Sequence, residues 1–129
     1  TGTSTGFDRN GHGLRLVFTG NSAWKLPGGG WESSIIDLAK FANAILQGSL
    51  LDNTDRLWTT VSGNSTYGYG INHAFNKRLA WHEGKHDTSR TLLYLFPGSA
   101  DRLGIVLMIN SINSSPMRIA AHLSEVLLN

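Results

Sequence analysis

The clearest periodic pattern in the chain lies between residues 34 and 47. Apolar residues recur there at intervals of three and four, the spacing of one face of an α-helix. Ser34, with Asp37 three residues later, resembles a capping box, and Gly48 stands where such a helix would end. The apolar positions are Ile35, Leu38, Ala39, Ala42, Ile45 and Leu46. The sequence therefore predicts an amphipathic helix over this segment.

Residues 67 to 110 have the pattern of β-strands instead. Residues 67–71 alternate large side chains with glycine, which would place both tyrosine rings on one face of a strand. Further strands are expected at residues 78–81, 91–96 and 103–109, and a tight turn over residues 97–102 joins the last two as antiparallel neighbours. Their near-continuous apolar runs predict a sheet that is covered on both faces.

The chain ends in a second predicted helix. Ser115 as N-cap and Pro116 at the first helical position precede apolar residues with helical spacing that extend to Leu127. The order is thus helix, strands, helix, without the alternation of strand and helix that builds a parallel sheet. The sequence therefore predicts an α+β fold, in which the C-terminal helix packs on an antiparallel sheet and the first helix lies alongside.

Loops and turns are expected to account for most of the other residues. Residues 1–30 are rich in Gly, Ser, Thr and Asn and should be mostly loop, with one strand-like run at residues 14–18. Residues 53–59 predict a short helical turn, and residues 62–66 a polar loop. These segments contribute little to the expected core.

Composition is that of one globular domain over residues 1–129. The apolar fraction is 40% and the charged fraction 16%, and no run approaches the roughly 20 apolar residues that span a bilayer. A net charge of +2, with 11 Lys and Arg spread along the chain, does not indicate a nucleic-acid partner. The absence of Cys excludes a thiolate nucleophile and a cysteine zinc site. The first residues carry no signal-peptide pattern, so we expect a mature or truncated end.

Residues 82–86 read His-Glu-Gly-Lys-His, which matches the zinc-protease signature H-E-x-x-H. The signature works only on a helix, where His82 and His86 would share one face and Glu83 would lie beside the metal-bound water. Gly84 disfavours a helix by about 1 kcal/mol, and the residues that follow favour a strand. The third ligand of the extended signature is also missing, because Leu92 occupies its place. A zinc peptidase is therefore the weaker alternative.

Seven short motifs follow one another along the chain. They are Pro27-Gly-Gly-Gly30, residues 34–41 (SIIDLAKF), residues 46–51 (LQGSLL), Tyr67-Gly-Tyr-Gly70, His82-Glu-Gly84, Tyr94-Leu-Phe-Pro97 and residues 104–110 (GIVLMIN). This ordered set resembles the C-terminal portion of the serine β-lactamase-like superfamily. That superfamily includes class C β-lactamases, low-molecular-weight penicillin-binding proteins, D-aminopeptidases and family VIII esterases. The resemblance covers nearly the whole chain from about residue 27 onward, and each motif alone is weak.

The resemblance implies a role for the run at residues 82–85. These enzymes share a Ser-x-x-Lys nucleophile, a Tyr-x-Asn or Ser-x-Asn element, and a strand with Lys-Thr-Gly or His-x-Gly, which His82-Glu-Gly84 matches. By resemblance, His82 would hold a substrate carboxylate or orient proton transfer. Gly84 would let the substrate backbone approach, and the backbone N–H of Lys85 would be an oxyanion donor. Candidate substrate-binding residues are Tyr67, Tyr69 and Glu83.

The first two elements of the superfamily have no good counterpart. The sole Ser-x-x-Lys, at residues 22–25, needs a helix, and the Pro-Gly-rich run at residues 27–30 would end any helix after one turn. Ser62-Gly-Asn64 and Ser111-Ile-Asn113 imitate the second element but come after the Gly-rich break, where superfamily order does not place it. The run at residues 85–88 also replaces the usual Gly-rich stretch. The half that carries the nucleophile is therefore expected to be missing.

These observations predict the C-terminal part of a serine hydrolase that acts through an acyl-enzyme on an amide, ester or β-lactam. Its partners would be a small-molecule or peptide substrate and an N-terminal half of the same hydrolase that carries the nucleophile. The resemblance implies no cofactor and a periplasmic or secreted location. The alternatives are a non-catalytic binding or interaction domain of the same fold and the zinc peptidase. His82 would then be a hydrogen-bonded histidine of the sheet or a metal ligand.

Overall fold

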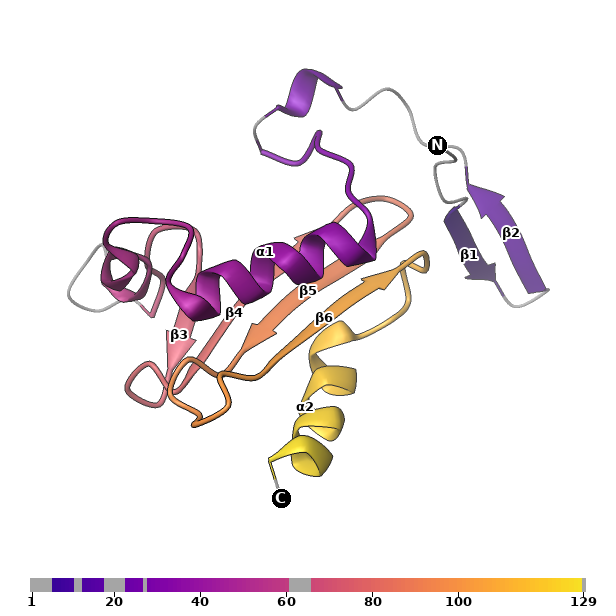
Figure 1. Ribbon diagram of the computed structural model, residues 1–129. Coiled ribbons are helices and arrows are strands. Elements are labelled where there is room, and N and C mark those ends of the chain that lie inside the picture. Colours follow the sequence, from indigo (N-terminus) through magenta and orange to yellow (C-terminus); the bar gives the residue numbers. More distant parts are fainter. Residues whose placement is uncertain (1–5, 11–12, 18–22, 27, 61–65, 129) are drawn as a thin grey trace.

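The computed structural model describes residues 6–10, 13–17, 23–26, 28–60 and 66–128 (Figure 1). Its strands form two sheets, one of two strands and one of four. In chain order the elements are β1 (Gly6–Asn10), β2 (Gly13–Val17), the 3₁₀ turn η1 (Ala23–Lys25), α1 (Ile35–Gln47), the 3₁₀ turn η2 (Thr54–Trp58), β3 (Asn72–Ala74), β4 (Leu79–Lys85), β5 (Arg90–Leu95), β6 (Gly104–Ile109) and α2 (Pro116–Leu127). The α+β class predicted from the sequence is confirmed.

The four-stranded sheet is antiparallel throughout, in the order β3-β4-β5-β6. Each strand follows its neighbour in sequence, as the short connections predict. The strand β5 is central, because β4 and β6 pair with it along its whole length. Two residues of β5, Leu92 and Leu95, have the largest fully buried side chains among the described residues. Their burial follows from helices that cover both faces of the sheet.

Successive side chains of β5 enter two separate hydrophobic clusters. Leu93 and Leu95 pack with residues of α1, including Ile45, on one face. Leu92 and Tyr94 pack with Ala120 of α2 on the other. This alternation is the pleat of a strand, and the predicted cover on both faces is confirmed; α1 crosses the sheet in Figure 1. We call the two sides the α1 face and the α2 face.

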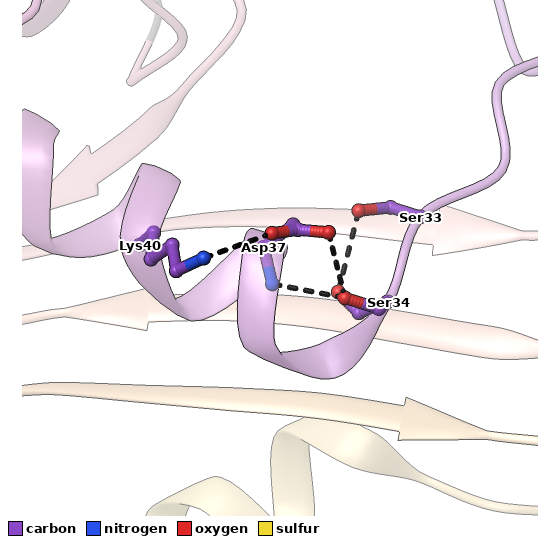
Figure 2. Close-up of polar contacts among 4 residues, drawn as sticks. All are labelled: Ser33, Ser34, Asp37 and Lys40. Carbon is purple, nitrogen blue, oxygen red and sulfur yellow. Dashed lines mark hydrogen bonds and ion pairs between the residues drawn. The ribbon is translucent and has the colours of Figure 1, made fainter.

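The start of α1 is fixed by a cap (Figure 2). The Ser34 hydroxyl accepts from the backbone N–H of Asp37 (3.1 Å) and donates to Asp37 Oδ2 (2.8 Å). Lys40 Nζ lies 3.3 Å from Asp37 Oδ1. The Ser34 hydrogen bond, and after it the hydrogen bond and charge of Lys40, lower the pKa of the Asp37 carboxyl. At the other end Gly48 adopts a left-handed conformation (φ 69°) and closes the helix. Both predicted ends of this helix are confirmed.

Besides β3 (Asn72–Ala74), for which no strand was expected, two segments differ from the expectations. Residues 67–71 form a turn rather than a strand, and only Tyr67 bridges to Asn72. The reason is the backbone of Gly70, whose φ of 82° no extended strand contains. Within residues 1–30, β1 pairs antiparallel with β2, so a hairpin stands where mostly loop was expected. The expected loop at residues 62–66 lies almost wholly outside the described residues.

The helices α1 and α2 are too short to span a bilayer, and no other helix in the described part of the chain could do so. The expectation of no membrane-spanning helix therefore agrees with the described structure. The helix α2 begins at Pro116, as predicted, although the Ser115 side chain makes no capping hydrogen bond. Its first turn is held instead by a backbone bond from Ile119 N–H to Ser115 O (3.2 Å).

The cap of α1 generates a stability prediction. Ser34→Ala should lower the free energy of unfolding by about 1 kcal/mol at pH 7, because a helix N–H loses its capping acceptor. The substitution also removes the hydroxyl that lowers the pKa of Asp37. The pKa of Asp37 is lower in the folded chain than in the unfolded chain, so its contribution is present above the ordinary value of 3.8 and is lost as the pH falls through the folded-state pKa. Urea unfolding at pH 7 and pH 3 measures both.

The neighbouring Ser33→Ala is the matched control, since the Ser33 hydroxyl reaches only the Ser34 carbonyl (3.3 Å). Its effect should be small at either pH, and the cost of Ser34→Ala should shrink at pH 3. Equal costs for the two substitutions would contradict the assigned cap.

Candidate functional site

The residues predicted to form the site lie where β4 extends beyond its neighbour β3. The strand β3 pairs only with Leu79, Ala80 and Trp81 of β4. Residues 82–85 therefore pair with β5 on one side, while the other side is an edge that β3 does not reach. An edge strand can hydrogen-bond an extended ligand through its backbone. The length difference between β3 and β4 thus creates the candidate site.

Strand alternation separates the four residues of this edge. His82 lies opposite Leu93 and Gly84 opposite Thr91, so both belong to the α1 face. Glu83 lies opposite Leu92, which belongs to the α2 face, and Lys85 follows with the same orientation. His82 and Gly84 therefore share one face of β4.

The backbone of Lys85 points toward the open edge. In the β4–β5 turn, His86 and Ser89 exchange two backbone hydrogen bonds, of 3.0 and 3.4 Å. Hydrogen-bonded pairs alternate with non-hydrogen-bonded pairs in an antiparallel ladder, so Lys85 and Arg90 form a non-hydrogen-bonded pair. The N–H of Lys85 is consequently directed away from β5. This is the direction that a backbone oxyanion donor needs.

Gly84 is required by its cross-strand neighbour. A Cβ atom at this position would overlap the Thr91 hydroxyl oxygen, which is the heavy atom nearest to that Cβ position. The Thr91 hydroxyl thus takes the place of a Cβ on the α1 face, and the backbone of Gly84 has no side chain of its own at the edge. A ligand that lies along the edge can approach this backbone closely.

The imidazole of His82 is held from outside its own strand. Its Nδ1 lies 2.5 Å from the carbonyl oxygen of Gly70, in the turn that precedes β3. His82 is otherwise exposed. The ring therefore has one fixed nitrogen and leaves Nε2 as the nitrogen with which a ligand could interact.

An open cavity of about 560 Å³ adjoins this edge. Every residue from His82 to His86 lines it, and so do Lys25 and Trp31 of the segment before α1. Further lining comes from Gly28, Gly29, Ser89 and Thr91. The lining contains two lysines against one glutamate, which favours an anionic ligand.

Lys25 and Trp31 are cavity residues that the sequence interpretation missed. Trp31 is 76% exposed, and Lys25 Nζ lies 5.3 Å from the centroid of the Trp24 ring. The only sequence signal for Lys25 is its place in the Ser-x-x-Lys match, for which the sequence predicts no suitable helix. The structure has a three-residue 3₁₀ turn at Ala23–Lys25, and Ser22 lies outside the described residues.

The candidate substrate-binding residues separate into two groups. Glu83 lines the 560 Å³ cavity and also a smaller cavity of about 220 Å³, which Arg90 and Ser115 line as well. Tyr67 and Tyr69 do not line either cavity and are exposed. They lie in the turn that contacts His82, and the expected substrate contact of Tyr67 and Tyr69 stays a prediction.

The zinc signature lacks the helix that it needs. Residues 79–85 are a strand, in which positions four apart are separated by roughly 13 Å rather than one helical turn. His82 and Glu83 also point to opposite faces. Within the described ranges no three His, Asp or Glu side chains are grouped as a metal site. The geometry therefore disfavours the zinc peptidase.

The imitations of the second element are not at this edge either. Ser111-Ile-Asn113 lies in the connection between β6 and α2, and does not line the 560 Å³ cavity. Ser62-Gly-Asn64 lies outside the described residues. The described part of the cavity thus combines a histidine, a bare backbone and an outward N–H, and its lining contains no serine other than Ser89.

The close approach at Gly84 generates a coupling prediction. Gly84→Ala should destabilise the chain by about 1–3 kcal/mol, because the new methyl group overpacks against the Thr91 hydroxyl. In a Thr91→Ala background the same change should cost little. Unfolding of the four chains of this double-mutant cycle measures the coupling, and additive costs would show that Thr91 is not the obstacle.

Comparison with known proteins gives no significant match to this chain among protein-family models, curated proteins or solved structures.

Proposed function

We propose that the chain is the C-terminal part of a serine hydrolase of the β-lactamase and penicillin-binding-protein type. It would act on an amide, ester or β-lactam through an acyl-enzyme. The observation that carries the proposal is the β4 edge, where His82 and Gly84 share a face and the N–H of Lys85 points outward beside one cavity. The resemblance in motif order assigns these same three residues to the substrate strand.

Each residue has a defined task in this reaction. A serine oxygen bonds to the substrate carbonyl carbon, its proton passes to a base, and the leaving group departs with a proton; water then releases the acyl group by the reverse steps. The N–H of Lys85 stabilises the negative charge that develops on the carbonyl oxygen. Gly84 lets the substrate backbone lie against β4. His82 contributes at the side of the substrate, through a carboxylate or through the proton-transfer network.

The nucleophile and its lysine would come from an N-terminal half of the same hydrolase. The outer edge of β6 supports such a partner segment. Residues 104–109 contain no charge and no proline, whereas exposed edge strands are usually protected by one or the other. Among the described strands β6 pairs only with β5, and α2 exposes Ile119, Leu123 and Val126 nearby. A further strand and helix would cover these apolar groups.

A second candidate is a binding domain of the same fold without turnover. The observation that favours it is Lys25, which lines the cavity but lies in a 3₁₀ turn of three residues. The Ser-x-x-Lys motif is expected on a helix, and among the described residues this segment has only the three-residue turn. Saturable binding of a carboxylate ligand with no hydrolysis by any longer form of the protein would favour this candidate.

The hydrolase proposal predicts that turnover depends on the partner segment. The chain alone should hydrolyse neither nitrocefin nor a p-nitrophenyl ester, and the chain extended by its upstream coding sequence should hydrolyse at least one. Turnover by the chain alone that is lost on Ser22→Ala would contradict the proposal. So would an upstream sequence without Ser-x-x-Lys.

The extended protein also tests the oxyanion donor. Lys85→Pro removes the outward N–H without breaking a bond to β5, and proline is tolerated at such an edge position. The loss in kcat should be about 10²–10³-fold. Lys85→Ala keeps the N–H and removes only the side chain, so its loss should be far smaller. Equal losses, with both variants folded by circular dichroism, would reject the assigned donor.

A further inference from the structure

The turn at residues 67–71 is built around two glycines with different constraints. Gly68 N–H donates to Ile71 O (2.7 Å), and Gly70 N–H donates to Gly68 O (2.9 Å). Tyr67 bridges to Asn72 at the start of β3. Gly70 has a φ of 82°, a left-handed conformation that only glycine, and less readily asparagine, adopts without strain. These hydrogen bonds within the turn and the φ of Gly70 therefore define one backbone conformation.

The turn is also fixed against the rest of the fold. Gly68 is buried, and a Cβ atom there would overlap the carbonyl oxygen of Leu57 and lie 2.9 Å from that of Thr59. These two carbonyls belong to the backbone of η2 and its end. Ile71, 5% exposed, packs into the core on the α1 face. Because both ends of the turn are held, the direction of the Gly70 carbonyl is determined by packing.

This carbonyl meets the imidazole of His82, with Nδ1 2.5 Å from Gly70 O. A carbonyl oxygen only accepts hydrogen bonds, so Nδ1 must carry the hydrogen. A neutral imidazole has a hydrogen on only one of its two nitrogens, and the other nitrogen has a lone pair that accepts a hydrogen bond. We propose that the turn at residues 67–71 is a positioning element that selects the Nδ1–H tautomer of His82 and makes Nε2 a hydrogen-bond acceptor at the 560 Å³ cavity.

The tautomer distinguishes the two tasks that the proposed function leaves open for His82, and this step alone rests on that function. A neutral ring with its hydrogen on Nδ1 cannot donate from Nε2 to a carboxylate. It can accept a proton or a hydrogen bond from a hydroxyl group. In its neutral form, the selected tautomer therefore assigns His82 to the proton-transfer network and leaves a substrate carboxylate to Lys25, which also lines the cavity.

Nitrogen NMR of the chain labelled at histidine tests the proposal without any substrate. Long-range proton–nitrogen correlations identify which ring nitrogen carries the hydrogen, and His82→Gln assigns the signal among the five histidines. Free histidine prefers the Nε2–H tautomer. At a pH where the ring is neutral, the ratio of Nδ1–H to Nε2–H at His82 should exceed that of free histidine by at least about fivefold, the effect of one hydrogen bond. A ratio no higher than that of free histidine in the unmodified chain would overturn the proposal.

Substitutions of Gly70 test the cause. Gly70→Val, which forbids the left-handed conformation, should turn the carbonyl away and shift His82 toward Nε2–H. Gly70→Asn, which tolerates that conformation, should retain the Nδ1–H form. Gly13→Val makes the same change at another glycine with positive φ (128°), in β2, and should leave the His82 signals unchanged. A folded Gly70→Val chain with the original tautomer would overturn the role of the turn.

The unmodified chain decides the tautomer even if Gly70→Val does not fold. The outcome is also independent of hydrolysis. A chain that shows the raised ratio but never gains turnover refutes the proposed function alone, and a hydrolase whose His82 has a ratio no higher than that of free histidine refutes the positioning role alone.

Discussion

The burial of β5 between two helices is the constraint on which the rest of the structure depends. Its side chains alternate between the cluster under α1 and the cluster under α2, and Leu92 and Leu95 are both fully buried. Such a strand cannot slip by one residue, because every buried side chain would change face. The register of β5 then fixes the register of β4, since the two strands pair along six residues. The positions of His82 and Gly84 are thus consequences of core packing.

Close helix packing on the α1 face depends on a missing side chain. A Cβ atom at Gly104 would lie 2.9 Å from Leu95 Cδ2 and 3.2 Å from Leu46 Cδ1. Glycine in β6 therefore lets α1 and β5 interlock at this point, where α1 crosses the sheet. The absence of a side chain also matters at Gly84. There it leaves backbone exposed at the edge of β4 instead of making room for a helix. One residue type serves the core in one strand and the candidate site in another.

The parts of the fold that the sequence predicted are those with local causes. Ser34 and Gly48 mark the ends of α1 because capping uses the residues next to the helix. The strands β5 and β6 were evident because strands of a sheet that helices cover on both faces have near-continuous apolar runs. The turn at residues 67–71 was misjudged as a strand, because alternation of tyrosine and glycine has the period of a strand whatever the φ of Gly70. A dihedral angle that tertiary contacts impose leaves no trace in a hydrophobic pattern.

The site was predictable to the same extent and for the same reason. His82, Gly84 and Lys85 could be identified because strand alternation orders them along one element. Lys25 and Trp31 could not, because their place at the cavity depends on how a distant segment returns to β4. The contact from the carbonyl of Gly70 was even harder to predict, because every residue has a backbone carbonyl and the residue type does not show where it points. The chemical character of His82 is then set by a group that no motif can encode, and the meaning of the H-E-x-x-H match changes accordingly. On a helix, this run would present imidazole nitrogens to a metal. On the edge of β4, one nitrogen is already bonded to the Gly70 carbonyl, and the other is left to exchange a proton.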